Sequence, residues 1–182
     1  MVEGRPLESV NKFTYLGSVV DTTGGSASDI KARMGKARAA FISLNKVWKD
    51  HTRSLKTKLR LFNSNVKSVL LYGCESWSLT QTLTNKLQGF VNGCLRRILR
   101  VRWPDMIRNE TLWQRTGQKP LAKELGQRRW RWIGHTLRKP SSSITRHALQ
   151  WNPQGQRRRG RPRTSLRRVM EEDFKKDGRD MA

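Results

Sequence analysis

The side chains with the most recognisable chemistry in this sequence are arginines that gather in three short stretches. They are Arg96, Arg97 and Arg100; Arg128, Arg129 and Arg131; and Arg157, Arg158, Arg159, Arg161 and Arg163. A guanidinium group binds phosphate through two parallel hydrogen bonds, inserts into narrow grooves and stacks on flat rings. The chemistry that these residues indicate is therefore recognition of a polyanion.

The sharpest local pattern is the run Arg157-Arg-Arg-Gly-Arg-Pro-Arg163. Its centre resembles an AT-hook, an extended peptide that lies in the minor groove of A·T-rich DNA. Pro162 would hold the backbone extended, Gly160 would avoid a clash with the groove wall, and the guanidinium groups would seek the negative potential of the groove. Two other interpretations stay open, namely a nuclear-localisation signal and a basic linker that binds any polyanion.

A second pattern interleaves Trp130 and Trp132 with Arg128, Arg129 and Arg131. Aromatic rings between cations are typical of surfaces that stack on unpaired bases. The alternative is that these tryptophans pack on a helical bundle as ordinary core residues.

The charge of the whole chain points to the same class of partner. Its 182 residues carry 38 Lys+Arg against 14 Asp+Glu, a formal net charge of +24, whereas a small soluble domain usually carries a net charge of about 2–8. Five arginines lie in residues 1–95 and nineteen in residues 96–182. Hydrophobic residues make up 35% of the chain and seven are tryptophan, which excludes a wholly disordered basic tail. We expect nucleic acid as the partner, with the second half as the stronger binding surface.

Other classes of protein are disfavoured by the same sequence. No apolar run approaches the roughly 18 residues of a membrane span, and the first residues lack the hydrophobic core of a signal peptide. Cys74 and Cys94 lie 20 residues apart, which fits neither a disulfide scaffold nor paired zinc ligands. We expect an intracellular, nuclear protein with no metal and no membrane partner.

Apolar spacing predicts the elements that must position these cations. Residues 11–20 mix aromatic and β-branched side chains and precede a turn signal at 21–25, which predicts a β-hairpin within residues 1–25. Three apolar stripes at spacings of three and four then predict three amphipathic helices, packed as an antiparallel bundle over residues 26–103. The stripes are Ile30, Met34, Ala37, Phe41, Leu44 and Trp48; Leu55, Leu59, Phe62, Val66, Val69 and Gly73; and Leu83, Leu87, Phe90, Cys94, Ile98 and Val101. The sequence Ser26-Ala-Ser-Asp29 predicts a capping box at the first helix.

The remaining chain predicts shorter elements. A Trp/Arg-rich segment over 104–140 contains a short helix at 109–116 and a longer one at 121–138. A basic linker over 141–182 carries the arginine run and a charged helix at 165–177. The predicted fold class is thus mainly α, with an N-terminal β-hairpin, a three-helix bundle, further short helices and an extended basic tail.

Five motifs, taken in order, resemble one family. They are Phe13-Thr-Tyr-Leu-Gly17, Ser68-Val-Leu-Leu-Tyr-Gly-Cys-Glu-Ser-Trp77, Gly93-Cys-Leu-Arg-Arg-Ile-Leu99, Arg129-Trp-Arg-Trp-Ile-Gly-His135 and Gly160-Arg-Pro-Arg163. Together they are similar to the C-terminal part of reverse transcriptases of non-LTR (LINE-type) retrotransposons, over residues 5–170. The order of the five motifs is more specific than any of them alone.

This resemblance implies particular roles. Phe13, Tyr15, Leu16 and Gly17 would form the primer grip, and residues 26–102 would form a thumb that holds an RNA/DNA template-primer duplex. Enzymes of this family need palm aspartates, including a Tyr-x-Asp-Asp-like motif, to hold two Mg²⁺ ions, and this sequence contains no adjacent pair of aspartates. Many relatives also carry a Cys/His zinc knuckle, a pattern that the cysteines and histidines here do not make.

We therefore expect a nucleic-acid-binding fragment of an RNA-directed DNA polymerase that cannot polymerise alone. It would hold no cofactor itself, since Mg²⁺ is implied only for the palm, and its partners would be nucleic acid and the palm and fingers of the parent polymerase. The alternatives are a free-standing, non-enzymatic DNA-binding protein anchored by Gly160, Arg161 and Pro162, and a relic reading frame.

Overall fold

The structure is a computed structural model that describes residues 10–22 and 25–150. The predicted AT-hook-like run and the predicted helix at 165–177 lie outside the described residues. Within them the chain is mainly helical and carries one N-terminal hairpin, as the sequence predicts. The described residues divide into two compact units, one made of those up to Gly73 together with Leu79–Leu121, the other of Cys74–Ser78 and residues 122–150.

The hairpin is the smallest element of the first unit. Strands β1 (Lys12–Tyr15) and β2 (Ser18–Asp21) pair antiparallel, with Phe13 opposite Val20. Leu16 and Gly17 form the turn with φ of 48° and 82°, the positive angles that suit a two-residue hairpin turn. The hairpin therefore turns inside the segment 11–20, where Gly17 accepts the left-handed conformation, and not at the turn signal of 21–25.

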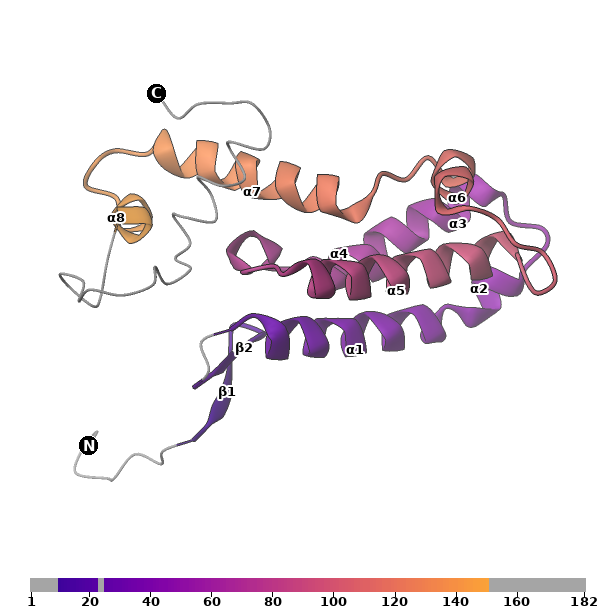
Figure 1. Ribbon diagram of the computed structural model, residues 1–182, viewed down its shortest axis with the longest axis horizontal. Coiled ribbons are helices and arrows are strands. Elements are labelled where there is room, and N and C mark those ends of the chain that lie inside the picture. The colour runs from indigo at the N-terminus through magenta and orange to yellow at the C-terminus, as the bar shows by residue number, and fades with distance from the viewer. Residues whose placement is uncertain (1–9, 23–24, 151–182) are drawn as a thin grey trace. The chain divides into compact units, whose positions relative to one another are not determined.

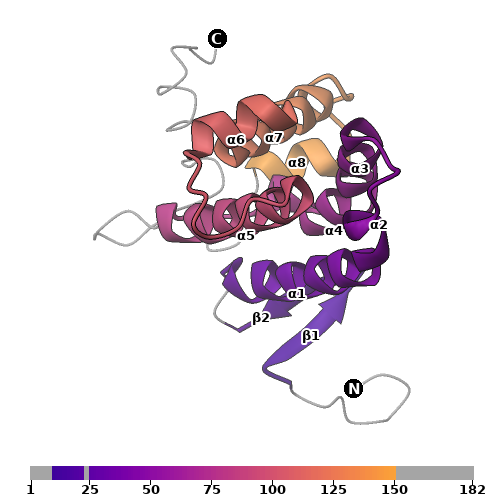
Figure 2. The same cartoon turned by 90° about the vertical axis from the view of Figure 1, so that its right-hand side faces the viewer.

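Helices make up the rest of the first unit (Figure 1). They are α1 (Ala27–Ser43), α2 (Asn45–Lys49), α3 (Leu55–Leu61), the π-helix η1 (Phe62–Lys67), α4 (Ser68–Leu70), α5 (Gln81–Leu99) and α6 (Asn109–Thr116). Helix α1 packs against η1, α4 and α5, and α3 packs against α5. Because α3, η1 and α4 follow one another directly and count as one helical segment, this is the predicted bundle of three helices. Figure 2 shows α1 running beside α4 and α5, with the hairpin at the start of α1.

The apolar stripes supply the core of this bundle. Phe41 stacks on Trp48 with ring centroids 5.1 Å apart and meets Phe62 edge-on at 6.4 Å. The indole Nε1 of Trp48 donates to the carbonyl of Phe41 at 2.7 Å. The first stripe predicts one continuous helix, but the structure breaks it at Leu44 into α1 and α2. Trp48 is nevertheless buried, as is most of the first stripe, and its indole bonds to the carbonyl near the end of α1.

The second unit contains η2 (Cys74–Ser76), α7 (Leu121–Leu137) and α8 (Ile144–Gln150). Helix α7 lies at the predicted place, whereas α8 falls in the segment predicted to be a linker. Local contacts start α8: the carbonyl of Ser143 accepts from the amides of Arg146 and His147, both at 3.0 Å, and Arg146 Nη1 donates to the carbonyl of Lys139. None of the described helices is long and apolar enough to cross a membrane.

Candidate nucleic-acid interface

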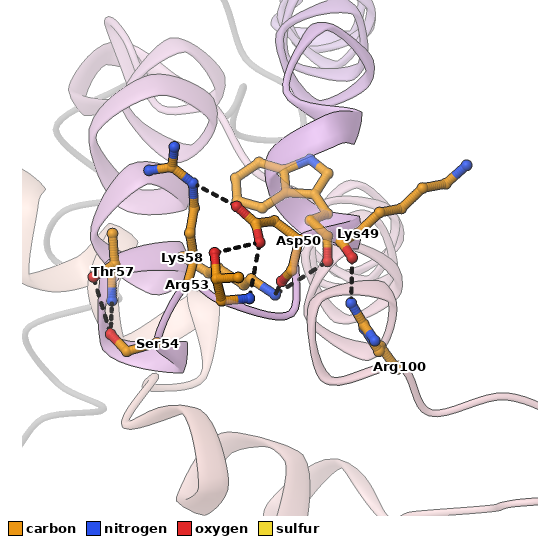
Figure 3. Close-up of polar contacts among 9 residues, drawn as sticks. Lys49, Asp50, Arg53, Ser54, Thr57, Lys58 and Arg100 are labelled. Carbon is orange, nitrogen blue, oxygen red and sulfur yellow. Dashed lines mark hydrogen bonds and ion pairs between the residues drawn. The ribbon is translucent and has the colours of Figure 1, made fainter.

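The end of helix α2 is built around cationic side chains (Figure 3). The amine of Lys58, which is buried, donates to the carbonyls of Trp48 and Asp50. On the other side, Arg100 donates to the carbonyl of Lys49. Cations at the C-terminal end of a helix satisfy its last carbonyls and complement its dipole. These two side chains therefore fix the position of the loop that follows α2.

Asp50 keeps that loop closed. Its carboxylate accepts hydrogen bonds from the hydroxyl of Thr52 at 2.7 Å and the amide of Thr52 at 2.8 Å, and Arg53 donates to it at 3.0 Å. These bonds hold the pKa of Asp50 below its usual value. The acid is thus engaged within its own loop, while Lys49 and His51 on either side of it are exposed.

The loop borders a cationic hollow of about 760 Å³, formed with the C-terminal end of α5. Its lining residues are Phe41, Ile42, Asn45, Trp48, Lys49, His51, Arg97, Arg100 and Arg102. Four of them are cations and none is acidic. Lys49, Arg97 and Arg102 are exposed, so their charge is available to an anion from solution. A concave surface of one sign focuses the electrostatic potential and attracts polyanions.

Among the predicted binding residues, Arg97 and Arg100 lie in this hollow and Arg96 does not. Arg100 ends α5 with a left-handed φ of 60°, and its Nη1 lies at hydrogen-bonding distance from the ring of His51. Arg96 instead donates to Asn109 Oδ1 at 2.8 Å and to the carbonyl of Ile107 at 3.3 Å, which ties α5 to the start of α6.

Sequence reasoning missed Lys49, His51 and Arg102 as partners of Arg97. A signal for them did exist. In an antiparallel bundle of three helices, the first and third helices end on the same side. The residues after the first predicted helix and those ending the third therefore had to meet.

The predicted primer-grip residues lie on the hairpin. Phe13, Tyr15 and Leu16 are exposed, as is Val20, so this face of the hairpin has no apolar cover within the described residues. The carbonyl of Gly17 accepts a hydrogen bond from Arg33 Nη2 at 2.8 Å. A Cβ added to Gly17 would lie 3.3 Å from that nitrogen, in a backbone conformation that side chains rarely adopt.

Helix α1 anchors the hairpin through two charged residues. The guanidinium of Arg33 lies over the ring of Tyr72, 4.3 Å from its centroid, and 3.9 Å from the carboxylate of Asp29. Asp29 in turn accepts from the amide of Val19 at 3.0 Å. The prediction of a capping box is wrong on one point, since Ser26 is the N-cap of α1 but its side chain makes no capping hydrogen bond.

The predicted Arg/Trp cluster lies on α7 in the second unit. Arg128 pairs with Glu124 at 3.4 Å, and Arg131 is exposed. Arg129 is buried and donates to the carbonyl of Trp77 at 2.7 Å, so its place is structural and it is not part of the interface proposed below. Trp130 and Trp132 are half-buried. The predicted residues of the run 157–163, including Gly160 and Pro162, lie outside the described residues.

Metal ligands and reactive thiols do not gather in the described part of the chain, where no group of three or more His, Cys, Asp or Glu side chains could hold a metal ion. Burial raises the pKa of the Cys74 thiol to about 12, with the charge of Glu75 adding to the effect. Burial likewise raises the pKa of Cys94 to about 12, against a smaller opposing effect of Arg97. Both thiols are therefore protonated at neutral pH.

We expect both cysteines to resist thiol reagents in the folded protein. At pH 8 a thiol of pKa 12 is ionised to roughly one part in 10⁴, against about a tenth for a thiol of pKa 9, and only the thiolate reacts. Ellman's reagent at pH 8 should therefore titrate no thiol within minutes, and two within seconds in 6 M guanidinium chloride. Rapid labelling of a Cys94→Ser variant without denaturant would show that Cys74 is accessible and contradict this expectation.

Comparison with known proteins gives two matches. Residues 40–72, from the end of α1 through α4, match a family described as a domain of unknown function (DUF6451). The chain is also 26% identical over 152 residues to a putative uncharacterized transposon-derived protein of Caenorhabditis elegans, a match that covers 81% of this chain and 54% of that protein. The chain thus spans about half the length of this curated relative. No solved structure matches this chain. The likeness to a transposon-derived protein is consistent with a transposable-element origin.

Proposed function

We propose that the first unit binds the sugar–phosphate backbone of a template-primer duplex, as the thumb of a LINE-type reverse transcriptase. The observation that carries the proposal is the cationic hollow, which lies at the end of a helical bundle and has no acidic residue in its lining. The order of the five sequence motifs and the transposon-derived relative support the same assignment.

The hollow divides its cations between two tasks. Arg100 is held by the carbonyl of Lys49 and the ring of His51 and shapes the wall. The exposed cations Lys49, Arg97 and Arg102 are the ones that would reach phosphate oxygens. Contacts of this kind fix the position of a duplex without reading its sequence. This chain would hold the duplex, and a palm would carry out the polymerisation, because the sequence has no adjacent aspartates to hold Mg²⁺.

Fluorescence anisotropy with a labelled RNA/DNA template-primer tests this function. We expect the full chain to bind the hybrid more tightly than either single strand of the same length. The logarithm of the binding constant should fall with the logarithm of salt concentration by about 0.9 for each phosphate neutralised, so that three contacts in the hollow give a slope near −3 or steeper. The same measurements on a chain carrying Arg161→Ala and Pro162→Ala remove the contribution of the predicted hook. Equal binding of duplex and single strand, with a shallow slope, would contradict the proposal.

A further inference from the structure

The loop between α5 and α6, residues 100–108, carries the two most exposed large apolar side chains in the described part of the chain. Trp103 is 90% exposed and Met106 is 91% exposed. A tryptophan left in water forgoes the burial of an unusually large apolar surface. Such exposure at a single loop is typical of a surface that meets a partner.

The loop is anchored at both ends, so Trp103 is presented from a fixed frame. At its start, Arg100 is bound to the carbonyl of Lys49, and near its end the carbonyl of Ile107 accepts from Arg96 at 3.3 Å. Between these anchors, the amide of Asp105 donates to the carbonyl of Arg102 at 2.7 Å. This bond closes a tight turn with Trp103 and Pro104 at its centre. A backbone held in this way loses little conformational freedom when the loop binds a partner.

Charge identifies the kind of partner. Arg102 lines the cationic hollow, and Trp103 follows it directly, about 3.8 Å along the chain from Cα to Cα. Because the two side chains begin on neighbouring Cα atoms, a nucleotide whose phosphate is bound by Arg102 lies next to the residue that carries the indole. Asp105 is the one acid of the loop, against Arg100, Arg102 and Arg108. The surroundings of Trp103 therefore suit an anionic partner that also offers flat apolar faces.

We propose that Trp103 stacks on the first unpaired base at the junction between duplex and single strand, while the hollow holds the adjoining phosphates. The bases inside a duplex already stack on one another, so an aromatic side chain gains most at a recessed end, where one face of a base is free. This inference rests on the proposed function and narrows its ligand from duplexes in general to duplexes with an overhang.

Three variants of the full chain test the inference: Trp103→Ala, Trp103→Phe and, as a matched control from the same loop, Met106→Ala. Each is measured against a blunt RNA/DNA hybrid and against the same hybrid with a four-nucleotide overhang, whose first unpaired base is 2-aminopurine. Because stacking on one base contributes about 1–3 kcal/mol, we expect the unaltered chain to prefer the overhang by roughly 5- to 150-fold. W103A should abolish this preference, whereas W103F and M106A should keep most of it.

The fluorescence of 2-aminopurine gives a second readout that a purely structural role would not move. Stacking on an indole should quench it in the unaltered chain and in M106A, but not in W103A. Equal affinity of the unaltered chain for both hybrids would overturn the inference, and so would an equal loss of affinity for both hybrids in W103A. If binding still depended steeply on salt, the proposed function would stand. Loss of binding to phosphatidylserine vesicles on W103A would assign the loop to a lipid surface and also overturn it. A chain that binds single strands through Trp103 but no duplex would instead overturn the proposed function.

Discussion

Reversing the charge of Lys49, Arg97 and Arg102 to glutamate is expected to weaken binding of a template-primer duplex on the order of 500-fold at 0.1 M salt. All three line the hollow and are exposed. Each phosphate contact releases about 0.9 of a counterion, which makes it worth roughly eightfold at 0.1 M relative to 1 M salt. The salt slope should therefore become shallower by nearly 3, because three contacts disappear together.

A matched control separates the hollow from the general charge of the chain. Lys36, Lys86 and Lys123 are exposed cations outside the hollow, and their reversal to glutamate changes the net charge by the same amount. We expect this control variant to lose less than tenfold in affinity and to keep most of the salt slope. Anisotropy titrations between 50 and 300 mM NaCl measure both quantities. Similar losses in the two triple variants would show that long-range attraction, and not the hollow, accounts for binding.

Arg100 differs from these three residues in what its removal would change. It is bound to the carbonyl of Lys49 and lies against His51, so its loss would disturb the wall of the hollow as well as its charge. Because the triple variant keeps Arg100, it changes the charge of the hollow without removing the side chain that shapes its wall. The same reasoning excludes Lys58, whose buried amine holds the end of α2.

The apolar pattern predicted the bundle well because burial of a stripe is a property that spacing alone reveals. Trp48, Phe62 and Ile98 all occupy stripe positions and all are buried. The break at Leu44 was beyond prediction, since it leaves the first stripe intact. The π-helical segment η1 shifts the second stripe, because Leu70 and Leu71 are buried after it whereas the predicted stripe residue Val69 is only half-buried. At the break, the indole of Trp48 donates to the carbonyl of Phe41, and the spacing of apolar residues does not report such a contact.

The candidate site was predicted less completely, because several basic residues bond to backbone carbonyls and are not available to a phosphate. Among the described residues, six cations donate to carbonyls near the ends of elements or in loops: Arg33 to Gly17, Lys58 to Trp48, Arg96 to Ile107, Arg100 to Lys49, Arg129 to Trp77 and Arg146 to Lys139. A basic residue that satisfies such a carbonyl and one that awaits a phosphate look alike in sequence. Arg96 and Arg97 are adjacent, yet only Arg97 lines the hollow.

Replacing Arg33 by methionine is expected to lower the free energy of unfolding by about 3 kcal/mol, because breaking a buried ion pair by removing one partner leaves an uncompensated charge. Arg33 is 6% exposed and Asp29 is 5% exposed. The variant removes the cation beside the carboxylate of Asp29 and the donor to the carbonyl of Gly17. For a chain of this size the loss corresponds to a fall in Tm of roughly 6–12 °C.

Arg38→Met provides the control, since Arg38 is an exposed arginine on the same helix, and its loss should cost less than about 0.5 kcal/mol. The double variant Asp29→Asn/Arg33→Met should recover part of the stability, because it no longer buries the charge of Asp29 without the cation beside it. Urea denaturation measures all three, and hydrogen exchange at the amide of Val19, which donates to Asp29, reports on the hairpin directly.

If R33M were as stable as R38M and the Val19 amide stayed protected, the hairpin would not depend on this pair. Faster exchange at Val19 with unchanged global stability would instead mean that Arg33 docks the hairpin onto a bundle that is stable without it. The exposed residues Phe13 and Tyr15 would then be positioned by one buried cation.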